Sequence, residues 1–175
     1  MVNINENDNI FDKRRFEEFC RLNKFEFPKA FVEYLEEHND AELEVNILDI
    51  GDNECCVRFF YGTSSEEYSD ICMIYKTYKE RMPKEIIPIA DPDSGNQICM
   101  SLAKETYGKI YFWDHEIMDT DDDEAYTTTI EDMKEIASSF DELLDNIKES
   151  PYVAEIKKKS IFWSEIFRKL QVVEM

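Results

Sequence analysis

Several residue types that build common catalytic and cofactor sites are scarce in this 175-residue chain. It has two histidines, whereas a catalytic zinc site takes about three protein ligands, usually including two or more histidines. Glycine-rich phosphate loops, a Gly-x-Ser-x-Gly elbow and a His-Glu-x-x-His helix are all absent from the sequence. The sequence therefore predicts no cofactor, no metal and no catalytic residue, and we expect a protein that is not an enzyme.

The chain also lacks a disulfide framework. Its five cysteines are an odd number and include no Cys-x-x-Cys pair. We expect reduced thiols in a cytosolic protein, with several of them buried as small hydrophobic residues. Within the vicinal pair Cys55–Cys56, strand alternation predicts one core and one surface side chain. The cysteines are Cys20, Cys55, Cys56, Cys72 and Cys99.

Long apolar runs are missing as well. No segment approaches the ~18 apolar residues that a membrane-spanning helix needs. Residues 1–10 are polar and rich in asparagine, without the basic and apolar regions of a secretory signal. A cytoplasmic location and no membrane partner are the resulting expectations.

What the chain does have is negative charge. Forty acidic residues against twenty basic ones give a formal net charge of −20, which repels nucleic acids and attracts cationic proteins. An acidic balance also serves solubility. Here, however, residues 114–149 hold fourteen acidic and two basic residues, whereas residues 151–175 hold three acidic and five basic ones. This concentration favours a partner-facing acidic surface.

The hydrophobic pattern predicts an α+β fold. Apolar residues make up 43% of the chain, enough for a core. Helical spacing or strand-like runs, bounded by turn residues, mark the individual elements. Helices are predicted for residues 11–23, 28–38 and 133–148 and, capped by Ser64 or Ser65, for a segment ending before Pro83; strands are predicted for residues 45–50, 56–61, 86–90, 97–102 and 109–113.

Short strands with tight turns favour a mostly antiparallel sheet, here flanked by N-terminal and C-terminal helices. We expect residues 1–150 to form one domain. Residues 151–175 are amphipathic, and we expect a helical extension that packs on the domain or on a second copy. The protein is then a monomer or a weak homodimer.

Three groups of polar residues invite a catalytic or metal-binding interpretation. In Trp113-Asp-His-Glu116, neighbouring strand residues point to opposite faces, which favours a strand end that satisfies local backbone. Asp91 and Asp93 flank a proline in a turn-like segment, where aspartate commonly bonds the backbone. Asp119-x-Asp121-x-Asp123 resembles the start of an EF-hand, but the required glycine and the final glutamate are absent. We interpret this last segment as a solvated or partner-facing acidic loop.

The order of several blocks is similar to that of the SUKH superfamily, which includes the Smi/Knr-like proteins. The similarity covers about residues 10–149 and departs from the family where Asn39-Asp40-Ala41 replaces the frequent Asn-Gly-Gly. The tail from Pro151 onward also extends past the usual end. The blocks are Phe27-Pro-Lys-Ala-Phe-Val-Glu-Tyr-Leu35, Ile87-Pro-Ile-Ala-Asp91, Gly95-Asn-Gln-Ile-Cys99, Gly108-Lys-Ile-Tyr-Phe-Trp-Asp-His-Glu116 and Ala137-Ser-Ser-Phe-Asp-Glu-Leu-Leu144.

This resemblance implies a central, mostly antiparallel sheet flanked by helices. For bacterial members it implies an immunity protein that neutralises a cognate toxin, and an acidic protein fits a basic nuclease as its target. A regulatory or scaffold module of the Smi/Knr type is the alternative, and a metal-dependent hydrolase using Asp91, Asp93, His115 or Glu116 is a weaker one. Near the acidic segment, Tyr111 and Trp113 are either interface anchors or core residues. The predicted partner-binding residues are Asp91, Asp93, Asp114, Glu116, Asp119, Asp121, Asp122, Asp123 and Tyr126.

Overall fold

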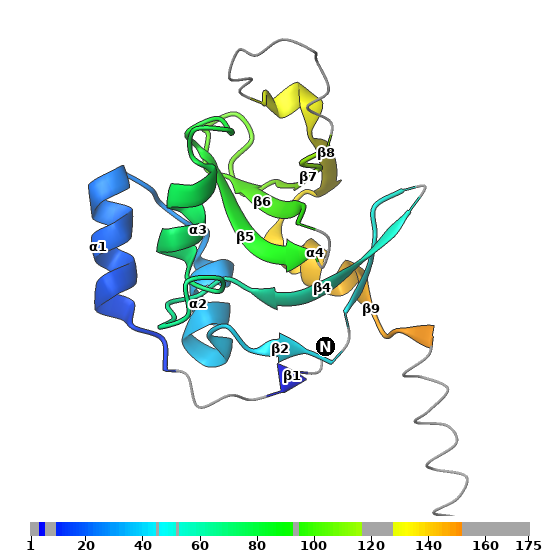
Figure 1. The fold of residues 1–175 in the computed structure, drawn as a ribbon, viewed down its shortest axis with the longest axis horizontal. Coiled ribbons are helices and arrows are strands. Elements are labelled where there is room, and N and C mark those ends of the chain that lie inside the picture. The colour runs from blue at the N-terminus through cyan, green and yellow to red at the C-terminus, as the bar shows by residue number, and fades with distance from the viewer. Residues whose placement is uncertain are drawn as a thin grey trace, which may run out of the picture.

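A computed structural model describes residues 4–5, 10–44, 46–51, 53–92, 95–116 and 128–151 (Figure 1). Within these ranges the fold is α+β, as predicted. The helices are α1 (Lys13–Asn23), α2 (Lys29–His38), α3 (Ile71–Tyr78) and α4 (Phe140–Asn146), with a 3-10 helix η1 (Ile130–Asp132). The strands are β1 (Ile4–Asn5), β2 (Glu42–Leu43), β3 (Ile47–Asp49), β4 (Glu54–Phe60), β5 (Ile86–Pro92), β6 (Gln97–Ser101), β7 (Ile110–Trp113), β8 (Lys134–Ala137) and β9 (Ile147–Lys148).

The strands form one curled antiparallel sheet in the order β1-β2-β4-β5-β6-β7-β8, and β3 joins β4 to β9. Strands β5, β6 and β7 form the predicted meander, with Ile98 opposite Phe112 and Gln97 opposite Trp113. The β3–β4 hairpin also agrees with the prediction. The two-residue strands β1 and β2 were not predicted, because such short segments carry no periodicity.

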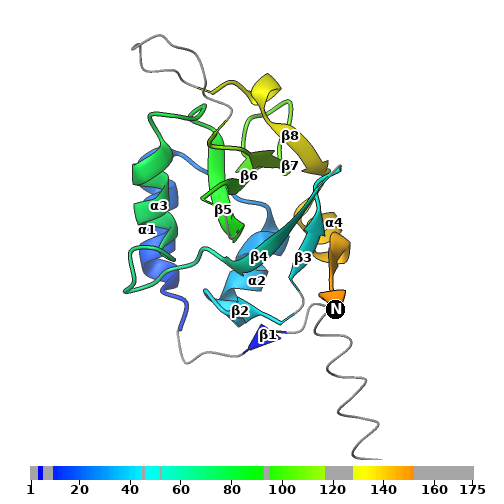
Figure 2. The ribbon, with the colours of Figure 1, turned by 45° about the vertical axis from the view of Figure 1, so that its right-hand side comes forward.

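Alternation along β5, β6 and β7 divides the core between the two faces of the sheet. On the first face, residues such as Ile98 and Phe112 join a large cluster with the helices. On the second face, Cys99 and Trp113 belong to a smaller cluster with Met82. Helices α1 and α3 lie side by side, α2 lies nearer β4, and η1 (yellow) lies away from all three, as Figure 2 shows.

Aromatic rings pack the first face. Phe31 of α2 is fully buried and lies against Phe27 and Phe140, with ring centroids 5.4 and 5.1 Å away. Phe25 meets Tyr75 of α3 edge-on at 5.2 Å. Because edge-to-face pairs contribute about 0.5–1.5 kcal/mol beyond their buried area, the Phe31–Phe140 pair helps hold α2 to α4, and the Phe25–Tyr75 pair helps hold the α1–α2 connection to α3.

Helix α3 begins later than predicted. Asp70, not Ser64 or Ser65, is its N-cap, and the Asp70 carboxylate accepts a hydrogen bond from the Met73 amide. The same carboxylate also accepts from the Ser64 amide and lies 2.9 Å from Arg15 of α1. The prediction was wrong because Ser64 belongs to a turn organised by this buried aspartate.

The predicted helix over residues 133–148 was also wrong at its start. Residues 134–137 form β8, which pairs with β7 through Glu135 opposite Tyr111. Ser139 then caps α4 by accepting a hydrogen bond of 3.2 Å from the Glu142 amide. The pairing of β8 with β7 and the N-cap at Ser139 therefore divide the predicted amphipathic helix into a strand and a shorter helix.

The turn after α2 carries Asp40 at a backbone position that glycine usually takes. Asp40 takes a positive φ of 45°, in the left-handed region where glycine is the usual residue. Aspartate tolerates this region, and the Asp40 carboxylate accepts a hydrogen bond from Ser69. Beside it, Asn39 is buried and bonds the backbone of Thr63 in both directions.

Candidate protein-binding surface

Two of the blocks singled out in the sequence meet at one end of the sheet. Gln97 opens β6 opposite Trp113, the last residue of β7. Just beyond them, the Asn96 side-chain oxygen accepts a 3.0 Å hydrogen bond from the His115 amide and lies 2.7 Å from His115 Nδ1. A side chain at Gly95 would crowd the same imidazole at 3.3 Å. The β5–β6 turn and the end of β7 are therefore joined through His115.

Asp91 lies at this end of the sheet but is not an open surface acid. It sits at the end of β5 opposite Phe59, is 8% exposed, and forms an ion pair with Arg58 of β4. The Arg58 guanidinium also lies 5.3 Å from the centroid of the Phe59 ring. The Asp91 carboxylate is thus committed to a neighbouring strand and presents little area to a partner.

Asp114 and Glu116 continue from β7 towards solvent. Asp114 is half-buried and accepts a 2.9 Å hydrogen bond from the Glu116 amide, while the Glu116 side chain is exposed. Within the described ranges, no three His, Cys, Asp or Glu side chains are placed to hold a metal ion. Asp114 and His115 make the local bonds expected of a strand end.

Behind this end, a buried polar and aromatic cluster occupies the second face. The Tyr61 hydroxyl donates to Gln97 Oε1 at 2.9 Å, and Gln97 Nε2 donates to the Tyr78 hydroxyl at 3.4 Å. Burial raises the pKa of both tyrosines, so both hydroxyls keep their protons. Tyr78 packs edge-on against Trp113 at 5.5 Å, and Arg81 lies over the same indole at 4.8 Å.

Tyr111 and Trp113 are core residues. They are 5% and 1% exposed, and both belong to the smaller cluster. The interpretation of these two aromatics as interface anchors is therefore wrong, since an anchor must be reachable by a partner.

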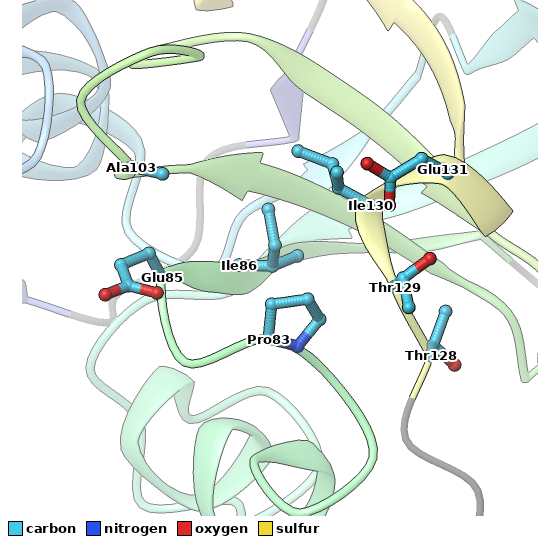
Figure 3. Close-up of a pocket in the computed structure, with 8 residues that line it drawn as sticks. All are labelled: Pro83, Glu85, Ile86, Ala103, Thr128, Thr129, Ile130 and Glu131. Atoms are coloured by element: carbon cyan, nitrogen blue, oxygen red, sulfur yellow. The ribbon is translucent and has the colours of Figure 1, made fainter.

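A groove opens on the second face, with a volume of about 500 Å³ (Figure 3). One wall comes from the connection between α3 and β5, and the other comes from the segment that leads into η1. Buried Ile86 lies between the two walls. The lining residues are Pro83, Glu85, Ile86, Ala103, Thr128, Thr129, Ile130 and Glu131.

Hydrogen bonds hold both walls of the groove. Thr128 accepts the indole N–H of Trp113 at 3.0 Å, and its amide donates to the Arg81 carbonyl at 2.9 Å. Thr129 opens η1 with a capping box in which its amide and hydroxyl donate to Asp132. On the opposite wall, the Leu102 amide donates to the Glu85 carbonyl at 2.7 Å. The groove is therefore preformed.

Sequence reasoning missed this groove. Its lining comes from three segments that are far apart in the chain, and no local pattern signals their meeting. A weak signal was available in Thr129-x-x-Asp132, which has the spacing of a capping box and indicated a short helix there.

The thiols lie in environments that suppress their reactivity. Burial raises the pKa of Cys20 to about 12 and those of Cys55 and Cys72 to about 11, and it raises the pKa of Cys99 as well. Because the thiolate is the nucleophilic form, these four thiols are inert at neutral pH. Cys55 and Cys56 are both half-buried, but Cys55 packs against the large cluster whereas Cys56 Sγ accepts a hydrogen bond from the Asn46 side chain, so the predicted core-and-surface division agrees in part.

The family model for "SMI1 / KNR4 family (SUKH-1)" matches residues 12–146, most of the chain. The chain belongs to this family. The matched range includes all the residues that line the groove and both blocks at the end of the sheet. The tail beyond residue 150 lies outside it, as expected from the resemblance.

A prophage-derived protein is similar to part of this SUKH-1 chain. The "SPbeta prophage-derived uncharacterized protein YokK" of Bacillus subtilis (strain 168) is 33% identical over 116 residues. That alignment covers 66% of this chain and 54% of the relative, so the chain spans about half of the relative's length.

Part of the predicted surface of this SUKH-1 protein lies outside the described residues, as does the tail over residues 152–175. In the described part of the chain, none of the helices has the length and hydropathy needed to cross a bilayer. The predicted partner-binding residues that fall outside it are Asp93, Asp119, Asp121, Asp122, Asp123 and Tyr126.

Proposed function

We propose that this SUKH-1 protein is a cytoplasmic immunity protein that binds a basic cognate toxin and neutralises it without catalysing a reaction. The observation that carries the proposal is the acidic concentration on a member of this family. Within residues 114–149, the described part alone holds nine acidic and two basic residues. Of these acidic residues, Glu131 lines the groove, whereas Asp114 and Glu116 lie just beyond the end of β7.

Charge complementarity supplies the physical rationale. A toxin that acts on nucleic acid needs a basic surface for phosphates, and carboxylates can occupy that surface instead. Long-range attraction also accelerates encounter, which suits a protein that must capture the toxin before it acts. Salt screens such attraction over a Debye length of about 8–10 Å near physiological ionic strength, so association is expected to slow as salt rises.

The described side chains support binding in place of catalysis. Asp91 is paired with Arg58, and His115 is held by Asn96. The raised pKa values of four thiols remove them as nucleophiles at neutral pH. Asp91, His115 and these four thiols are thus engaged in the fold or held in an unreactive form.

Co-expression tests the proposal. Each toxin-like gene next to the gene for this chain is expressed in a host, alone and together with the chain, and growth is recorded. The expected result is that one toxin arrests growth and that the chain restores it. The purified pair should form a complex whose association rate falls several-fold between low and high salt. Failure to restore growth against every neighbouring candidate would refute the immunity role.

A regulatory or scaffold module is the second candidate, favoured by the family's inclusion of the Smi/Knr regulators. It predicts an endogenous cellular partner and no toxin gene beside this one. Affinity purification from the native host, with and without deletion of the neighbouring genes, separates the two. A partner retained after that deletion supports the module and contradicts the immunity role.

A further inference from the structure

The groove on the second face combines an apolar floor with acidic sides. Ile86 lies at the floor, and the half-buried Pro83, Ala103 and Ile130 surround it. The charged residues that line it are two exposed glutamates, Glu85 beside one wall and Glu131 beside the other (Figure 3). An occupant must therefore offer apolar surface to the floor and positive charge to both sides.

The groove is also built in advance of binding. Thr128 is tied to Trp113 and to the Arg81 backbone, and η1 is closed by its capping box. Fixed walls reduce the conformational entropy that binding must remove, which favours association with a short segment. The volume of about 500 Å³ falls within the ~300–1,000 Å³ range of ligand sites, enough to receive a few side chains.

We propose that this groove docks a cationic segment of the partner protein, with lysine or arginine side chains near Glu85 and Glu131 and an apolar side chain on Ile86. The inference rests on the proposed function in one respect, since it takes the partner to be a basic toxin. Charge complementarity selects this occupant, because the acidic sides disfavour an anionic segment and are left unpaired by a neutral one. The basic, amphipathic tail and a second copy of the chain are the competing occupants.

The experiment uses three capped synthetic pentapeptides and the full chain carrying Trp163→Phe, which leaves Trp113 as the sole indole. The peptides are Lys-Leu-Ser-Ile-Lys, its charge-reversed form Glu-Leu-Ser-Ile-Glu, and Lys-Ser-Ser-Ser-Lys, which lacks apolar side chains. Nitrogen-15 NMR follows the Trp113 indole N–H, which bonds groove residue Thr128, together with the backbone amides of the lining. The first peptide is expected to shift these signals, and the other two to bind at least about fivefold more weakly.

Matched variants locate the charge effect. Glu85→Gln with Glu131→Gln is expected to weaken the first peptide about tenfold, whereas Glu17→Gln with Glu37→Gln, an equal change on α1 and α2, leaves its affinity unaltered. All four glutamates are exposed, so the fold should persist. Ala103→Arg, which fills the groove and adds a cation, should abolish the shifts.

Several outcomes overturn the proposal. Equal binding of the charge-reversed peptide does so, as does an equal loss in both pairs of glutamine variants. Binding only after truncation at Ser150 assigns the groove to the tail, and groove shifts on dilution without peptide assign it to a second copy; either result refutes a partner segment. No toxin is present, so failure here leaves the growth test of the immunity role standing, and failure of that test leaves this result standing.

Discussion

The two faces of the sheet are covered in different ways. Among the described residues, the first face lies in a cluster of twenty-six buried residues with helices α1 to α4, whereas six form the cluster on the second face. On the first face, the aromatic rings pack against one another and exclude water from the hydrophobic side chains. On the second, η1 and the α3–β5 connection replace long helices, and a groove remains between them. We therefore expect contacts on the first face to supply most of the stability, while the second face keeps an open groove.

The largest expected effect on the free energy of unfolding comes from truncating an aromatic ring on the first face, which tests whether this face supplies most of the stability. Phe31→Ala removes a fully buried side chain between Phe27 and Phe140. The free energy of unfolding should fall by about 3–5 kcal/mol, through lost burial and a residual cavity. Urea denaturation followed by circular dichroism measures it. A fall below about 1 kcal/mol would contradict the role given to the first face.

Removing one acceptor on the second face should cost less. Thr128→Val preserves shape but leaves the buried indole N–H of Trp113 without its partner, at about 1–3 kcal/mol. The same denaturation series measures it, and the Trp113 indole resonance should move. Thr77→Val, at an exposed hydroxyl on α3, is the control with a change within about 0.5 kcal/mol. A loss equal to that of Phe31→Ala would erase the proposed difference between the faces.

Removing the N-cap of α4 should give the next largest loss in the free energy of unfolding. Ser139→Ala removes the acceptor for the Glu142 amide at the start of a helix that covers the first face. We expect a loss of about 1 kcal/mol in the free energy of unfolding. Ser65→Ala is the matched control, because Ser65 is exposed and does not cap α3. If the two variants are equally stable, the boundary between β8 and α4 is misplaced.

The smallest effect concerns one exposed carboxylate on the same helix. The Ser138 hydroxyl and amide donate to Glu142 and lower its pKa. A lowered carboxylate pKa contributes stability above the unfolded-state pKa, and that contribution is lost as pH falls through the lowered value. Ser138→Ala should raise the pKa of Glu142 towards 4.5. Carbon-detected NMR titration measures it, and an unchanged pKa would show that the amide alone sets the shift.

Much of the fold was predictable because its signals are local. The helical spacing of apolar residues predicted α1 and α2. Short apolar runs bounded by turn residues predicted β5, β6 and β7. The prediction of one helix over residues 133–148 failed because the apolar pattern is ambiguous. Ile136, Ala137 and Phe140 fit one helical stripe, but they also fit the end of a strand followed by the start of a helix. The deciding interaction, pairing of Glu135 opposite Tyr111, spans a chain separation that periodicity does not register.

The candidate site was less predictable, for the same physical reason. Asp91 looked available, yet its partner Arg58 lies 33 residues away in the chain. The sequence left Trp113 open as an anchor or a core residue, and its hydrogen-bond partner Thr128 lies 15 residues away in the chain. The groove depends on residues from three separated segments. Sequence indicated the acidic character of this surface, whereas its shape follows from tertiary packing.

The bond between Trp113 and Thr128 has a consequence for protein engineering. Together with the pairing of β7 and β8, it anchors both ends of the segment between these two residues, across a separation of 15 residues. Both contacts are made by residues outside 117–127. Substitutions confined to 117–127 therefore leave both contacts in place, and they can change the charge of this stretch without removing an anchor of the sheet.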